Sequence, residues 1–204
     1  IIDIGAHIGA FSLLAATKYP QSHIFAFEPS PENFILLNKN IKANNLSKRI
    51  SSFKIAVTDG KKKYVTLNLH PDNLGMHSII SDYNLGQKGD RHEVKTISLE
   101  KIFYENEIKT CQILKLDCEG AECEILFSTP KKVLEKINNI VLEYTDHNQI
   151  DKLKKFLEDA GFKTKFYQTL PIPLPNAIKK LYRFKIGKAP MMLAWKSGSG
   201  RKKL

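Results

Sequence analysis

Short apolar runs alternate along this chain with longer segments in which apolar residues recur at helical spacing. The runs that we predict to be strands are residues 1–4, 22–27, 52–57, 112–116 and 139–143. The segments that we predict to be helices are residues 8–18, 31–44, 122–127, 130–136 and 150–160. Strands that alternate with helices favour an α/β fold, with a mostly parallel sheet and helices on both of its faces. Because ligands of such sheets bind at the carboxyl ends of the strands, polar residues that follow the runs are candidates for a functional site.

Two further regions complete the predicted architecture. Alternating patterns over residues 61–98, punctuated by glycines, indicate a β-hairpin insert on the α/β scaffold. Residues 162–167 and 191–195 have the pattern of a closing pair of strands. The segment between them is rich in proline, which predicts a long loop with a short helix at residues 176–182.

The length of 204 residues suits one domain, which we place at residues 1–196, with a basic, disordered tail at 197–204. Because the chain begins inside an apolar run, we expect this domain to be N-terminally incomplete. No apolar run approaches the roughly 18 residues of a membrane span, so we predict none. The three cysteines are too few for a disulfide framework, and the six histidines lack the spacing of a metal site. These features favour a cytoplasmic protein without a bound metal.

The charge balance bears on the partners of the protein. A net charge of +11, from 32 Lys and Arg against 21 Asp and Glu, suggests an anionic partner or surface. Nucleic acid is possible but less favoured, because the sequence lacks an obvious basic stripe interleaved with aromatic residues. The sequence does not indicate an oligomeric state.

A glycine-bearing turn follows the first apolar run, in the segment Asp3-Ile4-Gly5-Ala6-His7-Ile8-Gly9. The second run ends in Glu28, an acidic residue placed to hydrogen-bond ribose hydroxyls. The turn lacks the third glycine of the dinucleotide pattern, and Asp3 leads into it instead. A carboxylate there would repel a diphosphate and suit a cationic ligand. The pattern therefore predicts a nucleoside with a cationic tail, such as S-adenosylmethionine.

A second concentration of charge follows the fourth run. Lys115, Asp117 and Glu119 alternate, so in an extended segment they project to one side. Ionisable groups at the end of a buried strand are costly to bury without partners. For the two acids, contact with a cofactor or substrate is the favoured interpretation. For Lys115, the alternative to a functional role is a structural ion pair with a neighbouring acid. The fifth run ends in a similar polar segment, residues 143–147.

Four sequence blocks occur in order: D-I-G-A-H-I-G, F-A-F-E-P-S-P-x-N-F, L-K-L-D-C-E-G-A-E and I-V-L-E. Together they resemble the FkbM-type methyltransferase family over about residues 1–161, and K-x-D-x-E-G-x-E at residues 115–122 is the most specific block. The resemblance implies a Rossmann-like class I methyltransferase fold, in which a seven-stranded, mostly parallel sheet has an antiparallel last strand. It also implies S-adenosylmethionine as cofactor and methylation of a hydroxyl oxygen on a small molecule or glycan.

The resemblance assigns roles to individual residues. Those implied in cofactor binding are Asp3, Gly5, Ala6, His7, Ile8 and Gly9 at the methionine end, Glu28 and Pro29 at the ribose, Ala56 and Val57 at the adenine, and Ser78 beside the pocket. Asp117 and Glu119 would face the transfer site, where Lys115 keeps a neighbouring carboxylate ionised. An alcohol is a poor nucleophile at neutral pH, so a general base is expected. Asp117 or Glu119 is favoured for this role, and His77 and Glu143 are the other candidates.

Two other functions stay open from the sequence. An RNA methyltransferase would use the positive charge, and a nonenzymatic protein could bind the nucleoside as a sensor. The presence of acids at positions 117 and 119 favours an enzyme over the sensor.

Overall fold

The computed structural model describes residues 1–69, 78–79, 90–144, 149–167 and 191–196. The predicted helix at 176–182, the predicted tail at 197–204 and the candidate base His77 lie outside the described residues.

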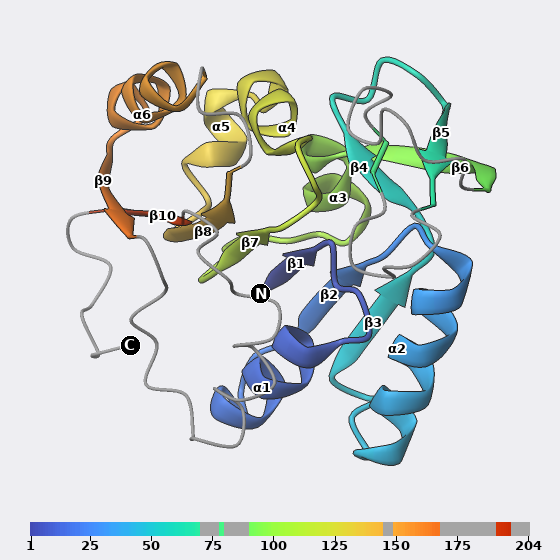
Figure 1. The fold of residues 1–204 in the computed structure, drawn as a ribbon. Coiled ribbons are helices and arrows are strands. Elements are labelled where there is room, and N and C mark those ends of the chain that lie inside the picture. The colour runs from blue at the N-terminus through green and yellow to red at the C-terminus, as the bar shows by residue number, and fades with distance from the viewer. Residues whose placement is uncertain (70–77, 80–89, 145–148, 168–190, 197–204) are drawn as a thin grey trace.

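A seven-stranded sheet forms the centre of the molecule (Figure 1). In spatial order its strands are β3 (Ile50–Phe53), β2 (Ile24–Phe27), β1 (Ile2–Ile4), β7 (Leu114–Leu116), β8 (Asn139–Glu143), β10 (Met191–Lys196) and β9 (Phe162–Tyr167). The first five pair in parallel, whereas β10 runs antiparallel to both of its neighbours. The predicted mostly parallel sheet with an antiparallel last strand is thereby confirmed. The carboxyl ends of the five parallel strands share one edge.

Helices cover both faces of this sheet (Figure 1). They are α1 (Ala10–Lys18), α2 (Pro31–Ala43), α3 (Leu99–Glu105), α4 (Glu122–Ser128), α5 (Lys131–Leu134) and α6 (Ile150–Asp159). Residues of α1 and α2 belong to one buried cluster, and residues of the other four helices belong to a second. Among the described residues, no helix combines the length and apolar character needed to cross a membrane.

A smaller sheet lies beside the large one and contains the predicted insert. Its order is β4 (Ala56–Thr58), β6 (Arg91–Ser98) and β5 (Tyr64–Asn68), and β5 pairs antiparallel with β6, which confirms the predicted hairpin pairing. The prediction of one strand over residues 52–57 was wrong. The chain leaves the large sheet after Phe53, and β4 then pairs in parallel with β6. An uninterrupted apolar pattern does not reveal such a change of partner, because both strands bury their side chains.

The ends of β1 and β7 meet closely at the glycine turn. Gly5 has φ +73°, and a Cβ built there would overlap the carbonyl oxygen of Asp117. The amides of Gly5 and Ala6 both donate to the carbonyl of Phe27, each at 3.0 Å. The amide of Asp117 donates to the carbonyl of Ile4 at 3.1 Å. Glycine at position 5 therefore permits three strand ends to converge.

We expect Gly5→Ala to lower the stability of the protein more than Gly161→Ala does. Both glycines have positive φ, but nothing lies within 4 Å of a Cβ built on Gly161, so this control isolates the conformational cost. The steric overlap at Gly5 should add about 1–3 kcal/mol to the loss. Chemical denaturation of the two variants and the wild type measures the difference. Equal losses would show that the strand ends separate freely.

Candidate functional site

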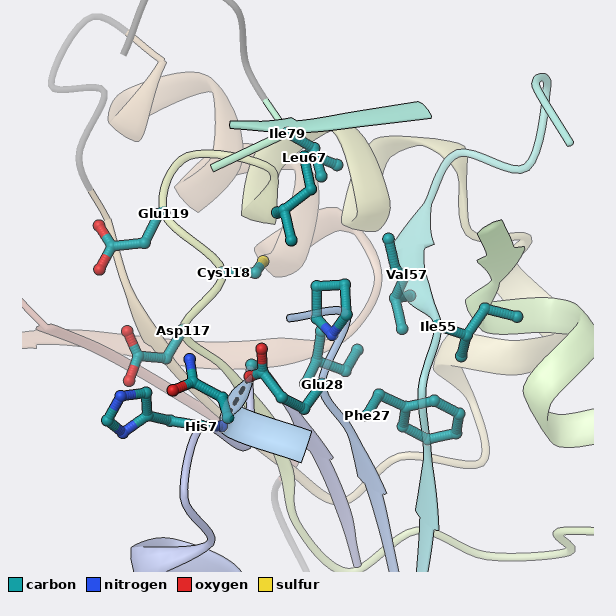
Figure 2. A pocket seen from close by; sticks show the side chains of 15 residues that line it. His7, Phe27, Glu28, Ile55, Val57, Leu67, Ile79, Asp117, Cys118 and Glu119 are labelled. Carbon is teal, nitrogen blue, oxygen red and sulfur yellow. Dashed lines mark hydrogen bonds between the residues drawn. The ribbon is translucent and has the colours of Figure 1, made fainter. Parts of the chain in front are cut away.

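A cavity opens at the shared carboxyl edge of the parallel strands, between the large sheet and the insert (Figure 2). Its volume is about 60 Å³. It is lined by Ile4, Gly5, His7, Phe27, Glu28, Pro29, Asn33, Ile55, Ala56, Val57, Leu67, Ile79, Asp117, Cys118 and Glu119. This is the edge at which the sequence predicted a functional site.

The two ends of the cavity differ in polarity. Figure 2 shows the side chains of His7, Asp117 and Glu119 gathered on one side. Apolar side chains occupy the other side, and Glu28 lies between the two groups. The apolar side is formed by Phe27, Ile55, Val57, Leu67 and Ile79. A ligand that matches this arrangement has an apolar ring system at one end and a cationic group at the other.

Glu28 ties the end of β2 to the glycine turn. Its side chain is 5% exposed, and its two carboxylate oxygens accept from the amides of His7 at 2.8 Å and Ser30 at 2.9 Å. Burial raises the pKa of Glu28, and these backbone hydrogen bonds oppose that shift. His7 has φ +52°, a left-handed conformation that is uncommon for a residue other than glycine. Glu28 thus fixes the turn and also lines the cavity.

Asp3 does not line the cavity. Its fully buried carboxylate accepts from the hydroxyl of Ser12 at 2.6 Å and pairs with the ammonium of Lys115 at 3.1 Å. The same ammonium lies 3.3 Å from the carboxylate of Asp117 and donates to the carbonyl of Gly5 at 3.0 Å. Lys115 therefore joins β1, the glycine turn and the end of β7, and it connects the buried Asp3 to an acid of the cavity.

The loop after β7 carries two of the predicted acids. Glu119 has φ +56° and Gly120 has φ +109°, so the chain makes a left-handed turn there. The carboxylate of Glu122 accepts from the amides of Cys118 at 2.8 Å and Gly120 at 3.0 Å. The hydroxyl of Ser78 donates to the carbonyl of Glu119 at 2.8 Å. Polar side chains from two directions thus bind the backbone of this loop.

The predicted site residues divide into two groups. Gly5, His7, Glu28, Pro29, Ala56, Val57, Asp117 and Glu119 line the cavity. The residues that do not line it are Asp3, Ala6, Ile8, Gly9, Ser78 and Lys115. Among them, Gly9 is the N-cap of α1, and Ser78 is buried beside the cavity-lining Ile79.

Sequence reasoning assigned no role to several residues that build the site. Asn33, Ile55, Leu67, Cys118 and Ile79 line the cavity, and Glu122 holds one of its loops. A role for Glu122 could have been inferred from its place in the block K-x-D-x-E-G-x-E, two residues after Gly120. The apolar residues of the insert carried no comparable signal.

Glu143 ends β8 beside the end of β7, next to this group of acids. Leu116 pairs with Leu142 in the parallel register of β7 and β8, so Asp117 and Glu143 follow at adjacent strand ends. Partial burial, and then repulsion from Asp117, Glu119 and Glu122, raise the pKa of Glu143 to about 8, against a smaller opposing effect of Lys115. Glu143 does not line the cavity.

Comparison with known families identifies the chain. The sequence profile described as "Methyltransferase FkbM domain" matches residues 3–164. The chain belongs to the FkbM methyltransferase family. This match confirms the predicted family and enzyme class, an S-adenosylmethionine-dependent methyltransferase.

Individual relatives of this FkbM methyltransferase are distant in sequence. Methyltransferase 1 of Beauveria bassiana is 28% identical over 177 residues, which cover 79% of this chain and 71% of that protein. The hexuronic acid methyltransferase AglP of Haloferax volcanii is 26% identical over 168 residues, which cover 79% of this chain and 62% of AglP. The crystal structure of Methyltransferase FkbM from Methylobacillus flagellatus has a similar fold, with a TM-score of 0.57 and 13% identity, over 95% of this chain and 42% of that one. The structural likeness confirms the Rossmann-like fold class.

We expect the stability of this FkbM methyltransferase to fall as pH rises from about 5 to 9, in part through Glu143. The folded pKa of about 8 lies above the ordinary value of 4.5, so the contribution is fully present below pH 4.5 and is lost as pH rises through 8. Glu143→Gln removes this loss, which is on the order of 1–2 kcal/mol after allowance for solvent screening at a partly exposed group. The variant should therefore gain melting temperature over the wild type at pH 9, by roughly 2–4 °C per kcal/mol, and gain little at pH 5.

The control is Glu93→Gln, which changes an exposed glutamate on β6. A difference between wild type and Glu143→Gln that stays the same at both pH values would contradict the raised pKa.

Proposed function

We propose that the cavity binds S-adenosylmethionine and that the enzyme methylates a hydroxyl oxygen on a small molecule or glycan. The observation that carries the proposal is the polarity of the cavity, which is apolar at one side, acidic at the other and has Glu28 between them. This order matches an adenine ring, a ribose and a cationic amino-acid tail.

The residues present fit each part of that cofactor. Ala56 and Val57 would hold the adenine against apolar surface, and Glu28 would accept hydrogen bonds from the ribose hydroxyls. Asp117 and Glu119 would face the transfer site, where the sulfonium of the cofactor meets the acceptor hydroxyl. The cavity volume of about 60 Å³ is below the roughly 300–1,000 Å³ of typical small-molecule sites, so the ligand would also extend over the rim.

The family relationship supports the class of acceptor. The relative AglP is named as a hexuronic acid methyltransferase, so its acceptor is a sugar acid, which carries hydroxyl groups and a carboxyl group. A hydroxyl acceptor on a small molecule or a glycan is consistent with that relationship.

One of the acids of the cavity would act as the general base that accepts the proton of the acceptor hydroxyl. The bound cofactor supplies a methyl group activated by its sulfonium charge. Asp117 and Glu119 would orient the acceptor hydroxyl, and a carboxylate oxygen of one of them would receive its proton, an effect worth about 10²–10⁴-fold. Lys115, 3.3 Å from Asp117, favours the ionised form of that carboxyl, which can accept a proton. Holding the reactants in place would supply much of the remaining rate enhancement.

We expect calorimetry to detect binding of S-adenosylhomocysteine and S-adenosylmethionine and to detect none of NAD. Glu28→Gln should weaken S-adenosylhomocysteine binding by about 10–100-fold, because it removes the charged acceptor for the ribose and directs an NH₂ group at one of the two amides that Glu28 binds. The matched control is Glu32→Gln, since Glu32 is an exposed acid in the first turn of α2. Binding of NAD in preference to the sulfonium compound would refute the assignment of the cofactor.

We expect labelled S-adenosylmethionine to transfer its methyl group to a hydroxyl compound, with a mass gain of one methylene. Asp117→Asn and Glu119→Gln should be tested separately on the acceptor that emerges from a panel of sugars and alcohols. At least one variant should lose about 10²-fold or more in turnover while it retains affinity for S-adenosylhomocysteine. Unchanged turnover in both variants would exclude these acids as the base. Labelling of RNA in place of hydroxyl compounds would overturn the proposed acceptor class.

A further inference from the structure

We infer that Glu122 and Ser78 are positioning residues, which hold the loop of residues 117–120 so that Asp117 and Glu119 face the cavity. Neither residue lines the cavity, so both would act through the loop and not on the reactants. The inference rests on the proposed function for its catalytic consequence, but the contacts that carry it are independent of that function.

The conformation of the loop requires support. Glu119 has φ +56°, and residues other than glycine adopt this left-handed region at an energetic cost. Gly120 follows with φ +109°. Glycine adopts positive φ at no such cost, so the conformation that the surrounding structure must hold is that of Glu119. The side chains of Glu119 and Asp117 would change direction if the turn relaxed.

Glu122 supports the loop from the first turn of α4. Its side chain is 3% exposed, and one oxygen accepts from the amide of Cys118 at 2.8 Å. The other oxygen accepts from the amide of Gly120 at 3.0 Å. A carboxylate offers acceptors on both sides, whereas a glutamine would direct an NH₂ group at one of the two amides. The charge and shape of Glu122 are thus matched to the two amides that flank Glu119.

Ser78 supports the loop from the insert. Its hydroxyl donates to the carbonyl of Glu119 at 2.8 Å, and its side chain is 1% exposed. The backbone of Ser78 pairs with Asn68 at the end of β5, with hydrogen bonds of 2.9 and 3.1 Å. The next residue, Ile79, forms part of the apolar side of the cavity. The hydroxyl of Ser78 therefore fixes the position of the loop relative to the part of the insert that lines the cavity.

Both supports act on the backbone of the loop. They bind the amides of Cys118 and Gly120 and the carbonyl of Glu119, and none of these bonds uses the Glu119 carboxylate. Glu119→Gln can therefore remove the charge while the turn is kept. Glu122→Gln does the reverse, because it keeps the charge of Glu119 and releases the turn. The two substitutions therefore distinguish the effect of the Glu119 charge from the effect of the loop conformation.

The test compares Glu122→Gln with Glu124→Gln, which changes an exposed glutamate in the same first turn of α4. Hydrogen exchange of the amides of Cys118 and Gly120 should accelerate about tenfold or more in Glu122→Gln, because hydrogen bonds to a charged acceptor are lost. Turnover should also fall about tenfold or more, while affinity for S-adenosylhomocysteine stays within about threefold. The control variant should change none of these values.

Ser78→Ala is the second variant, and it should lower turnover and accelerate exchange in the loop as well. Its control is Ser128→Ala, which removes a similar hydroxyl-to-carbonyl bond of 2.9 Å within α4. Unchanged exchange in Glu122→Gln would overturn the inference, as would accelerated exchange with wild-type turnover. A parallel fall of turnover, affinity and melting temperature would reduce Glu122 to a purely structural role and overturn it also. If the wild type binds no S-adenosylhomocysteine, the proposed function fails, and the exchange rates alone decide whether Glu122 holds the loop.

Discussion

The buried ion pair between Asp3 and Lys115 is the interaction on which the site depends. Asp3 lies fully buried in β1, and its charge is matched by Lys115 of the neighbouring strand β7 and by the hydroxyl of Ser12. A buried carboxylate without its partner carries a large desolvation cost, so the two strands are tied at this point. The same ammonium reaches the carbonyl of Gly5 and the carboxylate of Asp117. One cation thereby places the glycine turn and the first acid of the cavity in a fixed relation.

The sequence allowed the large sheet to be predicted because its signals are local. Buried parallel strands appear as apolar runs, and the helices between them show their own periodicity, so β8 was predicted with the bounds that the structure has. The alternating pattern of the antiparallel edge strand β9 also predicted its bounds. Residues 52–57 are divided between two sheets because β4 pairs with the distant strand β6. The local sequence pattern gives no indication of that pairing. The helix α3 was not predicted, although Ser98 caps it by accepting from the amide of Lys101 at 3.2 Å. At Leu99–Glu105, a short helix directly follows a strand, so its few residues give little periodicity.

The site was predictable to the extent that strand ends define it. Glu28, Asp117 and Glu119 follow apolar runs, and the shared edge of a parallel sheet brings them to one cavity. The partners of these acids come from distant parts of the chain, so their roles could not be read locally. Asp3 was expected to face the ligand, and in the structure its carboxylate faces Lys115 and Ser12. Leu67 and Ile79 join the site only through the pairing of the insert.

The acids of this region differ in what their carboxylates contact. Asp3 binds a lysine and a serine, and Glu122 binds two amides, so their buried charges are used within the fold. Glu28 binds two amides and also lines the cavity. Asp117 and Glu119 lie on one side of the cavity, and their repulsion adds to the effect of partial burial in raising the pKa of Glu143. Each further carboxylate at this edge disfavours the ionised form of its neighbours, so the site favours a ligand that carries positive charge. The hydrogen bonds and the ion pair of the buried acids hold the backbone that keeps the half-buried acids Asp117 and Glu119 close together.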